Sequence, residues 1–147
     1  MKAMVLVLVV AAVGLAGATQ ASARQGCSPG GSGNTKTFCG PAKGTLRYGI
    51  TRVSFNQGGR CGVSDQWTLN LGTITLIAKP QPGTKYLGIT AFGKTAGKHD
   101  AAITWQFRGK THTLARGTVT LARGLKRGTF RGLMSHHRWA RGSFTCR

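Results

Sequence analysis

The chain has 147 residues, of which 21 are Lys or Arg and only two, Asp65 and Asp100, are acidic, so its formal net charge at pH 7 is +19. Those two aspartates are the single carboxylate pair for a glycosidase mechanism and the sole acidic candidates for a serine triad, and no G-x-S-x-G motif occurs. A surface of this charge attracts polyanions at long range.

The first 23 residues have the pattern of a secretory signal peptide. Lys2 precedes an apolar run from Ala3 to Ala18, and the small residues Ala21-Ser22-Ala23 are typical of a cleavage site. We expect cleavage after Ala23, with Ala18 as the second choice, and a secreted protein, extracellular or periplasmic. The apolar run is shorter than the ~20 residues that span a bilayer, so we expect no membrane anchor after cleavage.

Four cysteines follow: Cys27, Cys39, Cys61 and Cys146. An even number in an exported chain implies two disulfides, for which three pairings exist. We expect Cys27 to pair with Cys39, which would hold a Gly/Ser/Pro-rich arm over residues 24–43, and Cys61 to pair with Cys146, which would tie the last strand to the first half of a domain over residues 44–147. The alternative is that the cysteines bind zinc, but no C-x-x-C pair occurs, and we expect no metal or cofactor.

Apolar residues alternate with polar ones in several short runs, which indicates half-buried strands. One run ends with Val53 and Phe55 in the opposite phase to Leu46 and Tyr48, which suggests a bulge near residues 51–52. The remaining runs contain Trp67, Leu69 and Leu71, with a phase change at Gly72, then Leu87, Ile89 and Ala91, then Ala101, Ile103, Trp105 and Phe107.

The clearest alternation lies between Leu114 and Cys146, where it predicts three strands. Loops at 124–127 and 136–138 would place Leu121, Phe130 and Phe144 opposite one another on the core face, because directly paired residues face the same side of a sheet. Arg131 would then lie on the solvent face. The whole pattern predicts an all-β domain, specifically an immunoglobulin-like antiparallel β-sandwich of about eight short strands, with a small β-barrel as the alternative.

Removal of the signal peptide would remove Lys2 alone among the charged residues and leave a charge of +18. The partners that this charge favours are anionic polymers, namely a cell-wall polymer, an acidic polysaccharide or a nucleic acid, and anionic lipid is a further possible partner. We expect binding by Arg131, Arg138 and Arg141 together with Trp139, which alternates outward beside them and can stack on a base or a sugar. The alternative is a solvated basic surface that reflects an Arg-, Gly- and Ala-rich composition.

A second functional hypothesis rests on the four histidines, His99, His112, His136 and His137. Two histidines and a cation would suffice for a ribonuclease-like phosphodiesterase, and His99, Asp100 and the 136–137 pair are a possible copper or zinc set. Histidines in loops of a basic surface are more often only solvated, so we expect a non-enzymatic protein and assign no catalytic residue.

The C-terminal run GTVTLARGLKRGTFRG and the closing GSFTC resemble the end of small exported all-β proteins of high-GC bacteria that have no assigned function. The resemblance covers roughly the last third of the domain. It implies an all-β fold and export, and it implies no functional residues.

Overall fold

The computed structural model describes residues 27–31, 33–77, 79–114, 116–134 and 137–147. These residues form eleven strands and no helix, which confirms the all-β prediction. The strands are β1 (Thr35–Phe38), β2 (Lys43–Tyr48), β3 (Thr51–Phe55), β4 (Gly59–Val63), β5 (Trp67–Thr75), β6 (Tyr86–Ala91), β7 (Gly97–Phe107), β8 (Lys110–Thr113), β9 (Arg116–Leu121), β10 (Arg127–Leu133) and β11 (Trp139–Thr145). The expected signal peptide lies outside the described residues, and the described ranges contain no helix long and apolar enough to cross a membrane.

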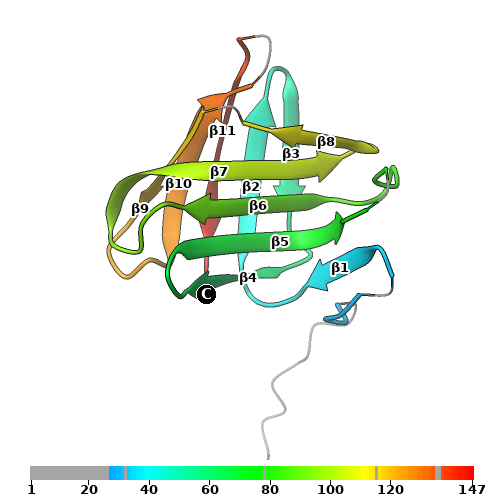
Figure 1. Ribbon diagram of the computed structural model, residues 1–147, viewed down its shortest axis with the longest axis horizontal. Coiled ribbons are helices and arrows are strands. Elements are labelled where there is room, and N and C mark those ends of the chain that lie inside the picture. The colour runs from blue at the N-terminus through cyan, green and yellow to red at the C-terminus, as the bar shows by residue number, and fades with distance from the viewer. Residues whose placement is uncertain (1–26, 32, 78, 115, 135–136) are drawn as a thin grey trace, which may run out of the picture.

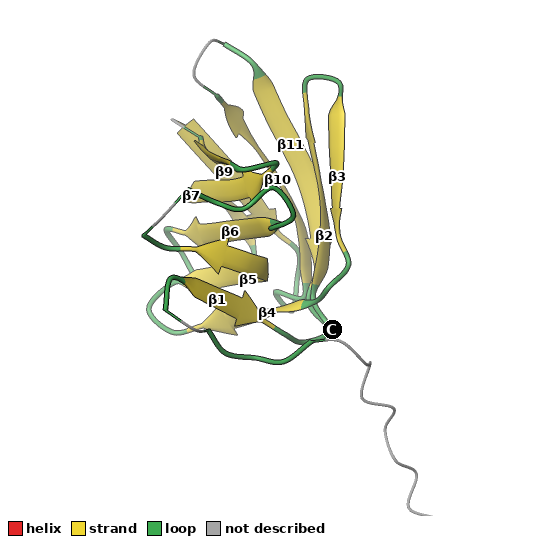
Figure 2. Ribbon diagram, turned by 90° about the vertical axis from the view of Figure 1, so that its right-hand side faces the viewer, coloured by secondary structure: helices red, strands yellow, loops and turns green. Residues whose placement is uncertain are grey.

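The eleven strands belong to one antiparallel sheet that curls into a half-barrel. Its order is β1-β5-β6-β7-β9-β10-β11-β2-β3, with β4 also paired to β5 and β8 also paired to β7. Figure 1 shows β5, β6 and β7 running across the view in front of β10, β11 and β2, and Figure 2 shows the same two layers from the side. We call β1 and β4–β8 the front layer, and β9–β11 with β2 and β3 the back layer. The eight-strand sandwich is therefore not confirmed, because the layers are parts of one continuous sheet.

The core lies between the two layers and consists of the inward residues that the alternation indicates. The front layer contributes Trp67, Leu87, Ile103 and Trp105, and the back layer contributes Leu46, Val119, Leu121, Phe130 and Phe144, all buried. The rings of Trp67 and Phe144 meet across the layers with their centroids 4.9 Å apart. Burial of such aromatic and aliphatic side chains is the main term that holds a small β domain together.

Phe130 and Phe144 are both inward, as expected, but they do not lie opposite each other. Phe130 pairs with Gly142, and Phe144 pairs with Gly128. The N–H of Met134 donates to the carbonyl of Arg138 at 2.7 Å, so the β10–β11 hairpin closes one residue earlier than predicted. The ring of Phe130 lies over Gly142 and the ring of Phe144 lies over Gly128. A Cβ atom at either glycine would overlap the ring, so these positions require glycine.

The same one-residue displacement occurs in the β9–β10 hairpin. The N–H of Ala122 donates to the carbonyl of Arg127, and Leu121 pairs with Gly128 instead of Phe130. A shift of one residue at both ends of a loop moves the pairing by two, so each side chain keeps its face. The predicted faces are thus confirmed for Leu121 and Phe130, and the predicted partners are wrong.

The expected bulge near residues 51–52 is a hairpin turn. Tyr48 pairs with Thr51, so Gly49 and Ile50 form a two-residue loop between β2 and β3. Gly49 has a φ of 56°, a value that glycine adopts without strain and that two-residue hairpin loops require. The phase change between Tyr48 and Val53 therefore marks a reversal of chain direction.

The two disulfides are those expected from the sequence. Cys27 pairs with Cys39 and Cys61 pairs with Cys146, with a Cα–Cα distance of 5.8 Å in each. The second disulfide joins β4 of the front layer to the residue that follows β11 of the back layer. Two disulfides are typical of proteins in an oxidising environment.

Candidate functional site

Four arginines form a continuous row across the outer face of the back layer. Register pairs Arg131 of β10 with Arg141 of β11, Arg141 with Arg47 of β2, and Arg47 with Arg52 of β3. All four are exposed and are directly opposite one another, so they face the same side of the sheet. We call them the arginine row. Adjacent strands lie about 4.8 Å apart, so the row extends over about 14 Å across the strand direction.

The arginine row has few acidic neighbours. The chain contains only Asp65 and Asp100. Asp100 of β7 pairs with Thr118 of β9, which in turn pairs with Arg131, so this carboxylate stands in line with the row two strands beyond its end. Like charges directly opposite each other destabilise a sheet, and a single carboxylate at one end does not neutralise four guanidinium groups.

A second row, of hydroxyl groups, runs parallel to the arginine row. Across the same strands, register aligns Thr120, Thr129, Ser143, Thr45 and Ser54, with Lys98 of β7 at the β9 end. The hydroxyl oxygens of Thr45 and Ser143 are 3.2 Å apart, within hydrogen-bond distance. Hydroxyl groups both donate and accept hydrogen bonds, so this row offers uncharged partners for phosphate, carboxylate or sugar oxygens.

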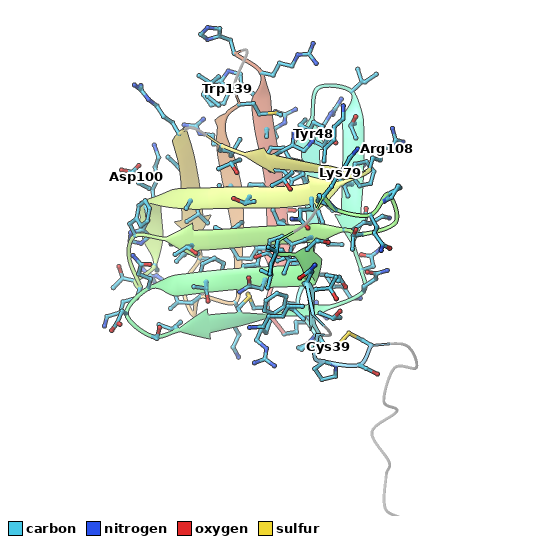
Figure 3. The ribbon with its side chains drawn as sticks, turned by 45° about the vertical axis from the view of Figure 1, so that its right-hand side comes forward. Cys39, Tyr48, Lys79, Asp100, Arg108 and Trp139 are labelled. Atoms are coloured by element: carbon cyan, nitrogen blue, oxygen red, sulfur yellow. A yellow bond between two sulfur atoms is a disulfide. The ribbon has the colours of Figure 1, made fainter. Side chains whose placement is uncertain are left out.

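The arginine row and the hydroxyl row, except Ser54, line a groove of about 710 Å³ on the outer face of the back layer. Lining residues include Lys98, Trp139 and all four members of the arginine row. Figure 3 shows Trp139 at the upper end of the back layer, opposite to the end where Cys39 lies. Trp139 is 61% exposed, whereas Trp67 and Trp105 have no exposed surface. The groove therefore combines cations, hydroxyl groups and one accessible indole.

The structure brings together three of the four residues that the sequence predicted for polyanion binding. Arg131 and Arg141 are register partners, and Trp139 lines the same groove. Arg138 is exposed at the β10–β11 hairpin and is not among the groove-lining residues.

Sequence reasoning missed Arg47, Arg52 and Lys98, which complete the groove. Arg47 and Arg52 join it because β2 pairs with β11, a contact between opposite ends of the chain. The change in the phase of the apolar alternation after Tyr48 was the sequence signal that could have identified Arg47 and Arg52. If that signal is interpreted as a hairpin, Arg47 and Arg52 become opposite neighbours.

The described histidines lie at separate places. His99, near the start of β7, has its Nε2 atom 2.8 Å from the carbonyl of Thr95. His112 of β8 pairs with Trp105 of β7. Trp105 is six residues after His99 on the same strand, so the two histidines are separated by roughly 20 Å along the strand direction. His137 is exposed at the β10–β11 hairpin, and His136 lies outside the described residues. Within the described part of the chain, no group of three His, Cys, Asp or Glu residues could hold a metal ion.

His112 belongs to a small aromatic cluster instead. Its ring stacks on Trp105 with centroids 5.1 Å apart and packs against Tyr48 at 5.5 Å. Burial lowers the pKa of His112, and the neighbouring Lys110 lowers it further. Burial raises the pKa of Tyr48, so the cluster as a whole favours uncharged rings.

Comparisons of the chain with protein-family models, with curated proteins and with solved structures found no match.

Proposed function

We propose that this protein is an exported, non-enzymatic domain that binds an anionic polymer along the arginine row. The polymer classes that fit are a cell-wall polymer, an acidic polysaccharide and a nucleic acid, which share a chain of phosphates or carboxylates. The observation that carries the proposal is the direct register of Arg131, Arg141, Arg47 and Arg52 on adjacent strands. Export is supported by the signal-peptide pattern and by the two disulfides.

The energetics of the row support a ligand. Four like charges on adjacent strands raise the free energy of the folded state, and two acidic residues in the whole chain leave most of this repulsion in place. A polymer with regularly spaced anions would reduce the repulsion along the full row and release its own condensed counterions. The parallel hydroxyl row could then bond oxygens of the same polymer, and Trp139 could stack on a base or sugar at one end of the groove.

Binding of a single-stranded oligothymidylate, of polygalacturonate and of a poly(glycerol phosphate) tests the proposal, with affinity measured at several salt concentrations. For the oligonucleotide, occupation of four arginines predicts that log K falls against log salt with a slope of about −3, since each phosphate contributes about −0.7. A Trp139→Ala variant should weaken oligothymidylate by about 1 to 3 kcal/mol.

The decisive comparison is between two double charge reversals. Arg131→Glu with Arg141→Glu should weaken the polymer that binds best at least tenfold more than Arg60→Glu with Lys79→Glu. Arg60 and Lys79 are exposed and do not line the groove, and both pairs change the net charge equally. Equal losses from the two pairs, with Trp139→Ala silent, would show that the charge acts diffusely and would refute the site. A histidine-dependent enzyme remains the alternative hypothesis, and no observed contact favours it.

A further inference from the structure

Two segments with exposed apolar side chains lie together at one end of the back layer. They are the Gly49–Ile50 loop between β2 and β3 and the start of β11, where Trp139 lies, and we call them the apolar tip. Figures 1 and 2 both show the β2–β3 turn and the start of β11 at the same end of the molecule. Because Ala140 pairs with Tyr48, the register continues so that Trp139 stands level with Gly49.

Ile50 has no role in holding the fold. Its side chain is 102% exposed, so it contributes no burial. It is the second residue of a two-residue hairpin loop, where Asn, Asp, Ser and Gly are the residues that turn geometry favours. A β-branched apolar side chain at this position is explained neither by turn chemistry nor by packing.

The apolar tip is surrounded by cations. Arg47 and Arg52 form the outward pair next to the Tyr48–Thr51 pair that closes the β2–β3 loop. Arg138 precedes Trp139 directly and is exposed. An isoleucine and an indole that are exposed among several arginines match the chemistry of an anionic bilayer, in which acyl chains and interfacial groups lie beneath phosphate groups.

We propose that this tip docks on an anionic lipid bilayer, with Ile50 and Trp139 inserted into the interfacial region and Arg47, Arg52 and Arg138 on the lipid phosphates. A hydrated polymer gains nothing from Ile50, because that side chain has no hydrogen-bonding group and no ring. A second copy of the chain is disfavoured at this tip, since contact between two tips would bring their arginines together. Arg47, Arg52 and Trp139 also line the polymer groove, whereas Ile50 and Arg138 belong to the tip alone.

Vesicle binding monitored by tryptophan fluorescence tests the proposal. Trp67 and Trp105 are fully buried, so Trp139 is the tryptophan whose emission can respond to insertion. Vesicles of phosphatidylglycerol and phosphatidylcholine should shift the emission to shorter wavelength and protect it from a water-soluble quencher, whereas vesicles of phosphatidylcholine alone should not.

The matched variants are Ile50→Ser and Ile77→Ser. Ile77 is 80% exposed in the loop that follows β5, so it controls for the loss of an exposed isoleucine elsewhere. Ile50→Ser should weaken vesicle binding about tenfold, because a buried aliphatic side chain is lost from the interface. Ile77→Ser should leave it unchanged, and thermal unfolding of both variants checks that they fold.

Three results would overturn the lipid assignment. One is an emission spectrum that does not change with anionic vesicles, and another is an equal loss of vesicle binding in the two isoleucine variants. The third is an Ile50→Ser variant that loses oligothymidylate binding while it keeps vesicle binding, which would assign the tip to the polymer groove. Loss of vesicle binding with intact polymer binding would support lipid docking whether or not the groove proposal holds.

Discussion

The outer faces of the two layers differ in the kind of side chain that they present. The outer face of the back layer presents the arginine row across β10, β11, β2 and β3. In the front layer the corresponding rows across β5, β6 and the second half of β7 contain Thr68, Asn70, Tyr86, Gly88, Thr90, Ala102, Thr104 and Gln106. Arg60 of the edge strand β4 is a cation in line with those neutral rows.

The neutral rows are stabilised by side-chain hydrogen bonds. The Tyr86 hydroxyl donates to Asn70 Oδ1 at 2.7 Å, and the buried Gln106 side chain bonds both the N–H and the carbonyl of Thr75. The arginine row instead consists of groups that repel one another. A composition bias toward arginine would place cations along the whole outer face of this one sheet, whereas the row of directly paired arginines lies on the back layer.

The largest expected effect comes from the disulfide that joins the layers. Replacement of Cys61 and Cys146 by Ser opens a loop with a sequence separation of 85 residues, which should lower the free energy of unfolding by about 4.5 kcal/mol in the chain-entropy model. The same replacement of Cys27 and Cys39, separated by 12 residues, should cost about 3 kcal/mol. Urea denaturation measures both, and an equal or reversed order would show that strain or residual structure dominates over loop closure.

The next comparison uses two neighbours on β10 that point to opposite sides. Phe130→Ala should cost about 3 to 5 kcal/mol of unfolding free energy, because it opens a cavity over Gly142 in the core. Arg131→Thr should instead stabilise the protein by roughly 0.2 to 1 kcal/mol, since it relieves the repulsion between Arg131 and Arg141. If Arg131→Thr proved as damaging as Phe130→Ala in urea denaturation, the assignment of the two faces would be wrong.

A smaller loss of stability than that of Phe130→Ala is expected for Tyr86 on the neutral face. Burial raises the pKa of Tyr86 to about 12, above its usual value of 10.0, so folding favours the protonated hydroxyl. This contribution is complete below pH 10 and is lost as the pH rises from about 10 to about 12. Tyr86→Phe should cost about 1 kcal/mol at neutral pH by removing the bond to Asn70.

The control for Tyr86 is the difference between wild type and variant as a function of pH, because this difference cancels the contribution of every group that the two proteins share. Unfolding free energies at pH 9 and pH 11.5 should fall more steeply for the wild type. Parallel curves would indicate that Tyr86 titrates normally and that its hydrogen bond contributes little.

Local periodicity predicts which side of a strand each residue occupies, and here it was sufficient for the core. Trp105 and Phe130 are buried and Arg131 is exposed, as the alternation indicates. Face assignment depends on steps of two residues, so it survives errors of one residue in the position of a loop. The pairing partner of each residue, in contrast, changes when a loop is misplaced by one residue. This is why Phe130 lies opposite Gly142 and not Phe144.

The candidate site was predicted only in part because half of it depends on a contact that is distant in sequence. Arg131 and Arg141 lie in one hairpin, and local reasoning placed them together. Arg47 and Arg52 reach them through the pairing of β2 with β11, which no local pattern specifies. Ile50 increased the difficulty, because an isoleucine in a two-residue loop hides a turn that Asn or Asp would have made visible.

The position of β3 at the end of the sheet has a consequence for self-association. An unpaired strand edge is a template for another copy of the same strand, and soluble proteins protect such edges with charge. Arg52 lies on β3, and a second copy that added its own β3 would bring the two arginine rows end to end. Repulsion between the rows therefore opposes edge-to-edge assembly of the free protein. A polyanion in excess would remove that barrier, so dimers paired through β3 should form where polymer and protein are both concentrated.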